Sequence, residues 1–282
     1  MSRRRGGNRH LHRLLRKPFF GRFEVPWVWP EGIATAGWER IDIDGPAGAT
    51  LAGFWGAAAP AQGTLVLAHP MGKAAKGFWL RQGHAELFLR AGFNVLVFDC
   101  NGFGESEAVS FDYPADILAA GRWAAKRTPS LPIGLVGASF GAGWGLCAMA
   151  RDGSPFRAAV LEAAFPTLPD FWRHYPAAFA LLKASQVVMP WLERGLRPEL
   201  EATRLVGRPA VLLVYGDADT YTPPAHGERL RQAMAPSARA EMDVLPGVGH
   251  TFAFRDAADA YATRVLTFLR KQLLGGPGLI AR

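Results

Sequence analysis

The segment LPIGLVGASFGAGWG, residues 131–145, runs from an apolar stretch through a glycine-rich bend into a helical pattern. The apolar stretch at 132–136 predicts a buried strand, and residues 140–151 predict a helix. Ser139 lies between them, two residues after Gly137 and two residues before Gly141. A sharp strand-to-helix turn exposes a serine hydroxyl at a helix N-terminus, where free N–H groups stabilise negative charge. The segment alone predicts either a nucleophile or a small residue in a tight bend.

Apolar runs of the same kind recur along the chain and predict an α/β fold. The first two are joined by the turn DGPAGA, which is short enough for an antiparallel hairpin. From the third onward they alternate with helical stretches, as in a parallel sheet with helices on both faces. The predicted strands are 38–43, 50–55, 64–69, 94–99, 132–136, 158–162, 210–215 and 240–245; the predicted helices are 78–91, 113–127, 140–151, 223–235 and 255–273.

The length of 282 residues, 49% of them hydrophobic, suits a single domain with a large core, predicted at 23–282. An aromatic-rich insertion at about 165–208 interrupts the alternation of strands and helices. It is too short for an independent domain and predicts a small helical cap. Its aromatic and histidine side chains include Phe171, Trp172, His174, Tyr175, Phe179 and Trp191.

The formal net charge of +8 comes from the first 22 residues, which hold eight basic side chains and no acidic one. The remaining residues carry 24 basic and 24 acidic side chains. The folded body is therefore neutral, and no nucleic-acid partner is expected. Residues 1–22 are predicted to be a solvated, flexible tail; the alternative is weak contact with an anionic membrane through Leu11, Leu14 and Leu15.

Cys100 and Cys147 lie in apolar surroundings and are too few for a disulfide framework. Buried thiols in a reducing compartment are expected, and with them a cytoplasmic location. The tail lacks the apolar core of a secretory signal, and no stretch approaches the ~20 apolar residues that span a bilayer. No cluster of His, Cys and Asp has metal-ligand spacing, so neither a metal nor another cofactor is expected.

Two later loops supply partners for Ser139. A serine hydroxyl needs a base to take its proton, and the base needs an acid to orient it. The loop PGVGHTF places His250 after the last predicted strand, and GDADTYTPP places Asp217 and Asp219 after the seventh. Because the carboxyl ends of parallel strands meet at one edge of a sheet, these side chains are expected to lie near Ser139.

The chain resembles an α/β-hydrolase over roughly residues 38–274, on the strength of the turn around Ser139, the GDADTYTPP loop and the GVGH loop. The resemblance implies that Ser139, Asp219 and His250 form a catalytic triad. In the family pattern G-x-x-D-x-x-x-P the acid is the third residue after the glycine, which favours Asp219 over Asp217. Glu162, at the end of the sixth predicted strand, is the second choice for the acid.

The resemblance also implies an oxyanion hole made by the amides of Met71 and Phe140. Met71 belongs to AHPMGKAAKG, where Pro70 replaces the glycine common in relatives; His69 is expected to brace this loop. Gly72-Lys73 does not complete a phosphate-binding loop, because the first glycine and the final Ser or Thr are missing. In the loop DCNGFGES, Ser106 is expected to be structural.

These features predict a serine hydrolase that cleaves a carboxylic ester or thioester through an acyl-enzyme. The aromatic cap and the pair Phe78-Trp79 beside the Met71 loop suggest an apolar acyl pocket. The residues expected to bind the acyl group are Trp79, Phe171, Trp172 and Tyr175, although aromatic residues at these positions also suit packing of the cap. One alternative is an acyltransferase, amidase or peptidase with the same triad. The other is a membrane- or partner-docking scaffold on an inactive hydrolase fold. The sequence leaves the oligomeric state open.

Overall fold

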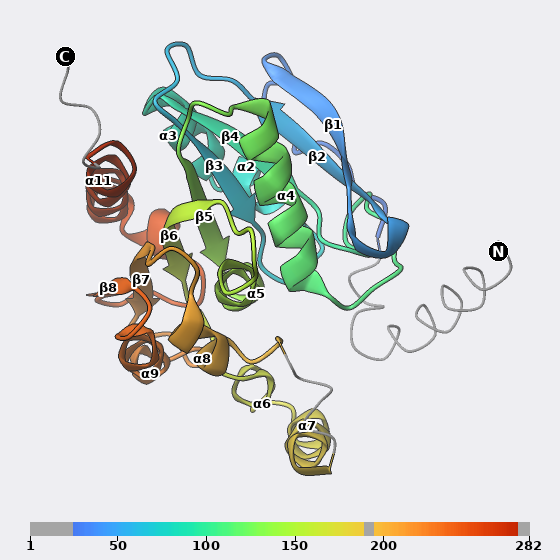
Figure 1. Ribbon diagram of the computed structural model, residues 1–282, viewed down its shortest axis with the longest axis vertical. Coiled ribbons are helices and arrows are strands. Elements are labelled where there is room, and N and C mark those ends of the chain that lie inside the picture. Colours follow the sequence, from blue (N-terminus) through green and yellow to red (C-terminus); the bar gives the residue numbers. More distant parts are fainter. Residues whose placement is uncertain (1–24, 189–194, 276–282) are drawn as a thin grey trace, which may run out of the picture.

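The computed structural model describes residues 25–188 and 195–275. The predicted basic tail, the cap residue Trp191 and the last seven residues lie outside the described residues. The described chain forms one eight-stranded sheet with helices on both sides (Figure 1). The strands are β1 (Trp38–Asp44), β2 (Thr50–Gly56), β3 (Gly63–Ala68), β4 (Phe93–Phe98), β5 (Ile133–Ala138), β6 (Phe156–Glu162), β7 (Ala210–Gly216) and β8 (Arg239–Leu245).

The strand order across the sheet is β1-β2-β4-β3-β5-β6-β7-β8. Strand β2 pairs antiparallel with both β1 and β4, and every other pairing is parallel. The predicted fold class, with its antiparallel second strand, is confirmed. Strands β3, β4 and β5 are buried along their whole length. Because both faces of the sheet are covered here, their apolar residues follow one another and do not alternate with exposed polar ones.

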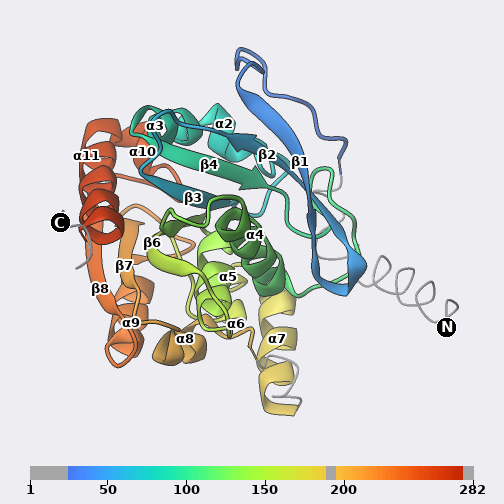
Figure 2. The same ribbon diagram turned by 45° about the horizontal axis from the view of Figure 1, so that its top comes forward.

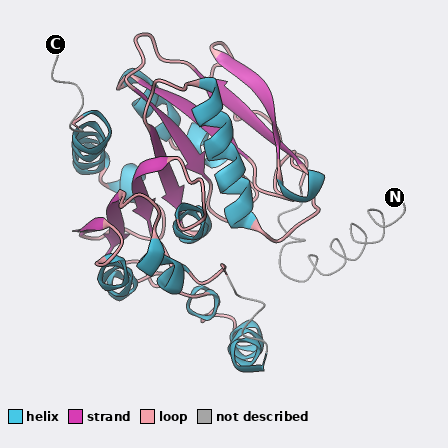
Figure 3. Ribbon diagram, in the orientation of Figure 1, coloured by secondary structure: helices cyan, strands magenta, loops and turns pink. Residues whose placement is uncertain are grey.

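Helices cover both faces of the sheet (Figure 3). Each helical layer packs on the sheet through its own apolar core. One layer contains α4, α5 and α9, and the other contains α2, α3, α10 and α11. Figure 2 shows the sheet between α4 and α5 on one side and α2, α3 and α11 on the other. The bounds are α2 (Gly77–Arg81), α3 (His84–Arg90), α4 (Tyr113–Arg127), α5 (Phe140–Met149), α9 (Pro224–Met234), α10 (Ala253–Asp256) and α11 (Ala258–Leu269).

Two of the predicted helices are each interrupted. The stretch predicted as one helix at 78–91 is divided into α2 and α3, because Gly83 has a φ of 80°, in the left-handed region that ends a helix. The stretch predicted at 255–273 begins as α10, breaks at Ala257, continues as α11 and ends in the π-helical turn Arg270–Leu274. The helix predicted at 113–127 has those bounds in the structure.

The described part of the insertion is helical, as expected for a cap. It contains α6 (Leu168–Phe171), α7 (Pro176–Val188) and α8 (Pro198–Glu201). Helix α7 has no buried residue and lies at the bottom of Figure 1, away from the sheet. Of the helices in the described ranges, none is both long enough and apolar enough to cross a bilayer.

Candidate active site

Ser139 occupies a strained turn between β5 and α5. Its φ of 49° and ψ of −107° lie outside the regions that non-glycine residues normally adopt. The turn is held by a hydrogen bond from the Ser139 amide to the Glu162 carbonyl oxygen at 2.8 Å. The backbone packs closely here: a Cβ at Gly141 would collide with the carbonyl oxygen of Ala68. The strain and the close packing are the physical basis of the glycine spacing around Ser139.

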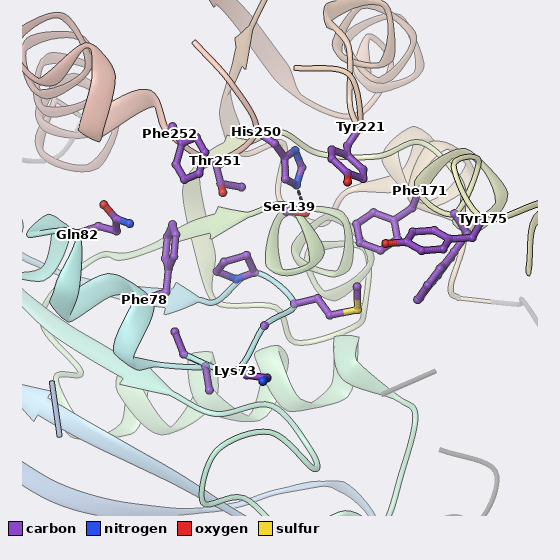
Figure 4. Close-up of a pocket in the computed structure, with 16 residues that line it drawn as sticks. Lys73, Phe78, Gln82, Ser139, Phe171, Tyr175, Tyr221, His250, Thr251 and Phe252 are labelled. Atoms are coloured by element: carbon purple, nitrogen blue, oxygen red, sulfur yellow. Dashed lines mark hydrogen bonds between the residues drawn. The ribbon is translucent and has the colours of Figure 1, made fainter. Parts of the chain in front are cut away.

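A chain of hydrogen bonds joins Ser139 to the two loops that follow β7 and β8. The His250 ring lies with Nε2 2.8 Å from Ser139 Oγ (Figure 4). On its other side, Nδ1 lies 2.7 Å from Asp219 Oδ2. Because an ionised carboxylate only accepts hydrogen bonds, Nδ1 carries a proton and donates a hydrogen bond to Asp219. Nε2 is then the ring nitrogen that faces the Ser139 hydroxyl, which is the geometry a base needs to take the serine proton.

Asp219 is 3% exposed and remains ionised because of its hydrogen bonds. Its Oδ1 accepts the amides of Tyr221 and Thr222 at 2.8 and 2.9 Å, and Oδ2 accepts the Thr222 hydroxyl at 2.6 Å. Burial opposes the charge, but the hydrogen bonds from His250 and Thr222 outweigh it and hold the pKa of Asp219 below its ordinary value. The carboxylate is therefore available to orient the imidazole near neutral pH.

The alternative acids do not contact the imidazole. Asp217 is exposed, and its Oδ1 accepts the Gly247 amide at 2.6 Å, as a turn residue would. Glu162 is buried, and its Oε1 accepts the Ala253 amide at 3.0 Å. Of the three carboxylates considered from the sequence, the structure brings Asp219 onto His250.

The loop after β3 is fixed by His69. Its Nε2 accepts the Cys100 amide at 3.1 Å, so Nδ1 carries the proton and donates to the Pro70 carbonyl oxygen at 2.8 Å. In a trans peptide the C=O and N–H point in opposite directions. The Met71 N–H therefore points away from the His69 ring, and Met71 lines the cavity beside Ser139. Phe140, the other predicted donor residue, is buried at the start of α5.

The same loop is anchored by a fully buried lysine. Lys76 Nζ lies 2.5 Å from Asp99 Oδ2 and 2.7 Å from Glu105 Oε2, and the Lys76 amide donates to Asp99 Oδ1 at 2.9 Å. Trp27 covers this ion pair: its ring centroid is 3.9 Å from Nζ, and its Nε1 donates to the Ala74 carbonyl at 3.2 Å. The segment before β1 therefore clamps the loop that contains Met71.

A cavity of about 440 Å³ opens at Ser139 and His250. This volume is within the range of sites for small molecules. Figure 4 shows Phe78, Gln82 and Phe252 on one side of Ser139 and Phe171, Tyr175 and Tyr221 on the other. The remaining lining residues are Pro70, Met71, Gly72, Lys73, Ala74, Ala75, Trp172 and Thr251.

The lining corrects one of the predicted substrate-binding residues. Phe171, Trp172 and Tyr175 line the cavity, but Trp79 does not: it is fully buried in the core beside His84. Its neighbour Phe78 lines the cavity instead. Adjacent residues on a helix point about 100° apart, so only one of the two aromatic side chains can face the site, and composition alone does not tell which.

Several residues that line the cavity or hold its loops in place were not predicted from the sequence. Thr222 and Tyr221 follow Asp219 directly, and Phe252 follows His250 by two residues, so their place in the two loops was the available signal. The buried Lys76 and Trp27 had no such signal, because lysines are rarely fully buried. Gln82 directly follows α2, within the stretch predicted as one continuous helix.

The other singled-out residues have structural roles. Ser106 Oγ donates to the Asp99 carbonyl oxygen at 2.7 Å and accepts the Ala52 amide, as expected for a structural serine. His84 in α3 and His226 in α9 are buried. Cys100 and Cys147 are buried free thiols, as expected. Within residues 25–188 and 195–275, no three His, Cys, Asp or Glu side chains are grouped so that they could hold a metal ion.

Comparison with known proteins gives one family and many similar structures. The family described as serine aminopeptidase, S33, matches residues 59–210. No curated protein matches the chain significantly by sequence. An esterase of Pyrococcus furiosus has a TM-score of 0.70 at 19% identity, with 88% of this chain and 98% of that chain covered.

Two similar structures are peptidases of greater length. A puromycin-hydrolyzing peptidase of Mycobacterium tuberculosis has a TM-score of 0.65 at 19% identity, with 86% of this chain and 41% of that chain covered. An acylaminoacyl peptidase of Pyrococcus horikoshii has a TM-score of 0.62 at 14% identity, with 84% and 42% covered. At these identities the likeness shows a common fold, and the fold predicted from the sequence is confirmed.

Proposed function

The chain belongs to the serine aminopeptidase S33 family of α/β-hydrolases, and we propose that it is a serine hydrolase of carboxylic esters or thioesters with a hydrophobic acyl group. The observation that carries this proposal is the unbroken hydrogen-bonded chain Ser139–His250–Asp219 at the wall of an aromatic cavity. This order of nucleophile, base and acid is the one that acyl transfer requires.

In the proposed reaction Ser139 Oγ attacks the acyl carbonyl carbon while its proton passes to His250 Nε2. Asp219 stabilises the resulting imidazolium. The carbonyl oxygen becomes an oxyanion, which the amides of Met71 and Phe140 stabilise; each such donor contributes on the order of 3 kcal/mol to lowering the barrier. The orientation that His69 imposes on the Pro70–Met71 peptide supports the role of Met71.

Collapse of the intermediate breaks the bond to the alcohol or thiol, which leaves with the proton from His250. Water then attacks the acyl-enzyme, giving one proton to His250, and the acid is released as Ser139 regains its proton. The chemistry uses side chains and amides of this chain alone.

The lining favours esters over peptides with a free N-terminus. In the described part of the chain, no Asp or Glu lines the cavity, while Lys73 and His250 do. A site for a free α-ammonium group would leave that charge without a carboxylate partner, which is costly in a partly desolvated pocket. The aromatic walls instead suit an uncharged hydrocarbon chain.

The test is a series of p-nitrophenyl esters and acyl thioesters of increasing chain length, run beside aminoacyl p-nitroanilides. We expect turnover of the esters or thioesters with an optimum at medium chain length, and stoichiometric labelling of Ser139 by a fluorophosphonate. Ser139→Ala should abolish both. Faster cleavage of the anilides would assign the site to peptides, and transfer to an added alcohol in place of water would assign an acyltransferase. Labelling at another serine would overturn the assignment of Ser139.

A further inference from the structure

Glu162 connects the two segments that carry Ser139 and His250. It is the last residue of β6 and lies beside Ala138, the last residue of β5. Its main-chain oxygen accepts the Ser139 amide at 2.8 Å, at the strained turn itself. The backbone of Glu162 therefore supports the serine on the sheet edge.

The side chain of Glu162 reaches the other segment. Its Oε1 accepts the Ala253 amide at 3.0 Å, in a buried hydrogen bond between residues 91 positions apart. Ala253 begins α10, three residues after His250. The intervening turn contains Thr251, whose φ of 59° is in the left-handed region. The backbone between His250 and α10 is therefore strained. A bond at its far end restricts where the imidazole can lie.

Burying the carboxyl group of Glu162 at this position costs free energy. Glu162 is 3% exposed, and its Oε2 and the hydroxyl of Tyr261 are both buried without a hydrogen-bond partner among the described residues. The titratable groups whose charge acts on it are His250 and Asp219. Burial raises the pKa of Glu162 to about 7, against the hydrogen bond from Ala253 and the attraction of His250.

A leucine or methionine of similar size would fill this space at less cost, unless the oxygen that binds Ala253 is needed. A role as a second acid on the imidazole does not fit, because Asp219 occupies Nδ1. The remaining contribution of the side chain is the bond to Ala253.

We propose that Glu162 is a positioning residue, whose side chain ties the His250 loop to the strand beside the Ser139 turn and so sets the distance between Nε2 and Oγ. The proposal rests on the proposed function of Ser139 and His250. Displacements of about 1 Å at reacting groups typically cost on the order of 100-fold in rate. Binding of substrate to the aromatic walls does not involve Glu162, so the effect should fall on kcat.

The experiment compares three side chains at this position, with kcat expressed per active site titrated by a fluorophosphonate. Glu162→Gln keeps an oxygen acceptor of the same length. Glu162→Leu removes the acceptor, and Glu162→Asp keeps the acid but shortens it by one methylene, so it stands in for the leucine variant should that one fail to fold. We expect kcat to fall by about 10- to 100-fold in E162L and E162D, with KM within about twofold of wild type, and to return to within about threefold in E162Q.

The matched control is Glu201→Leu. Glu201, the last residue of α8, is also a buried acid, 4% exposed, but it binds Arg204 in the turn that follows and does not line the cavity. This variant should lose stability and keep its titrated kcat. If E162L and E162D keep the wild-type kcat, the bond to Ala253 is refuted as a positioning contact. It is also refuted if the kcat of E162Q falls as far as that of E162L, since the charge of the side chain would then matter and not its acceptor oxygen. Absence of Ser139 labelling in the wild-type protein would instead overturn the proposed function.

Discussion

Thr222 and Asp219 are joined by two hydrogen bonds, from the Thr222 amide to Oδ1 at 2.9 Å and from the Thr222 hydroxyl to Oδ2 at 2.6 Å. Together with the Tyr221 amide, they leave the carboxylate one orientation, in which Oδ2 also accepts His250 Nδ1. The carboxylate of Asp219 is thus fixed against His250, and both of its oxygens accept hydrogen bonds.

Asp219→Asn should lower kcat by on the order of 10⁴-fold. An amide NH₂ placed against Nδ1 favours the tautomer in which Nε2 carries the proton, and that ring cannot accept the proton of Ser139. Asp217→Asn is the matched control, because it changes the same loop and keeps the acceptor for Gly247; kcat should change less than about threefold. Steady-state assays with an activated ester measure both. A larger loss in the Asp217 variant would transfer the role of the acid to that residue.

Lys76→Met should destabilise the fold by about 3–5 kcal/mol, because Asp99 would remain buried without its cation. Both side chains of this pair are fully buried. Denaturant unfolding gives the free energy of unfolding. The control is Arg40→Gln, which breaks the 2.7 Å bridge to Glu105 at a position where the arginine side chain is 58% exposed; that loss should stay below about 1 kcal/mol.

A double variant, Lys76→Met with Asp99→Leu, should recover part of the loss, because it removes the unpaired charge along with its partner. If the double variant is no more stable than Lys76→Met, the loss comes from packing against Trp27 and not from the charge of Asp99.

Gly141→Ala should destabilise the fold by more than about 3 kcal/mol, since the new Cβ would collide with the carbonyl oxygens of Ala68 and His69, which are backbone atoms and cannot rotate away. Gly72→Ala is the control in the neighbouring loop: a Cβ there has no heavy atom within 4 Å, and unfolding should be unchanged. Thermal unfolding followed by circular dichroism compares the two. Equal melting temperatures would show that α5 can shift away from β3.

Glu162 should make stability depend on pH in a way that Glu162→Gln removes. The folded-state pKa of about 7 lies above the ordinary value of 4.5, so this group favours folding most below pH 4.5 and the gain is lost as the pH rises through 7. At 1.36 kcal/mol per pH unit, the loss is about 3 kcal/mol in total. Relative to wild type, E162Q should therefore gain about this much between pH 4.5 and 8 in urea unfolding. A difference that stays constant with pH would mean that Glu162 is ionised throughout.

The strands were predicted to within two residues of their ends because their burial is encoded locally, in runs of apolar residues bounded by turn residues. The loops that bring Ser139, Asp219 and His250 together follow from the same pattern, since parallel strands present their carboxyl ends at one edge. The bounds of the helices between the strands were harder to predict. The break between α2 and α3 depends on the backbone of Gly83 alone.

Long-range polar contacts were not predictable from local pattern. The bonds of Lys76 to Asp99 and of Glu162 to Ala253 join positions 23 and 91 residues apart, and neither partner has a periodic signal. The choice between Phe78 and Trp79 at the cavity depends on the rotation of a five-residue helix, which is too short to show an apolar face. These contacts follow from tertiary packing, which one sequence does not reveal.

Trp27 lies before the first strand and contacts the loop that contains Met71, so the residues that support this loop begin upstream of the sheet. A fragment that began at Trp38 would keep all eight strands and the whole Ser139–His250–Asp219 chain. It would nevertheless uncover the Ala74 carbonyl and the Lys76 ammonium, the two points at which Trp27 contacts the loop that contains Met71. Truncations for crystallisation, domain swaps and directed-evolution libraries should therefore be cut before Val25, because the shorter fragment keeps the strands while the loop that contains Met71 loses both contacts with Trp27.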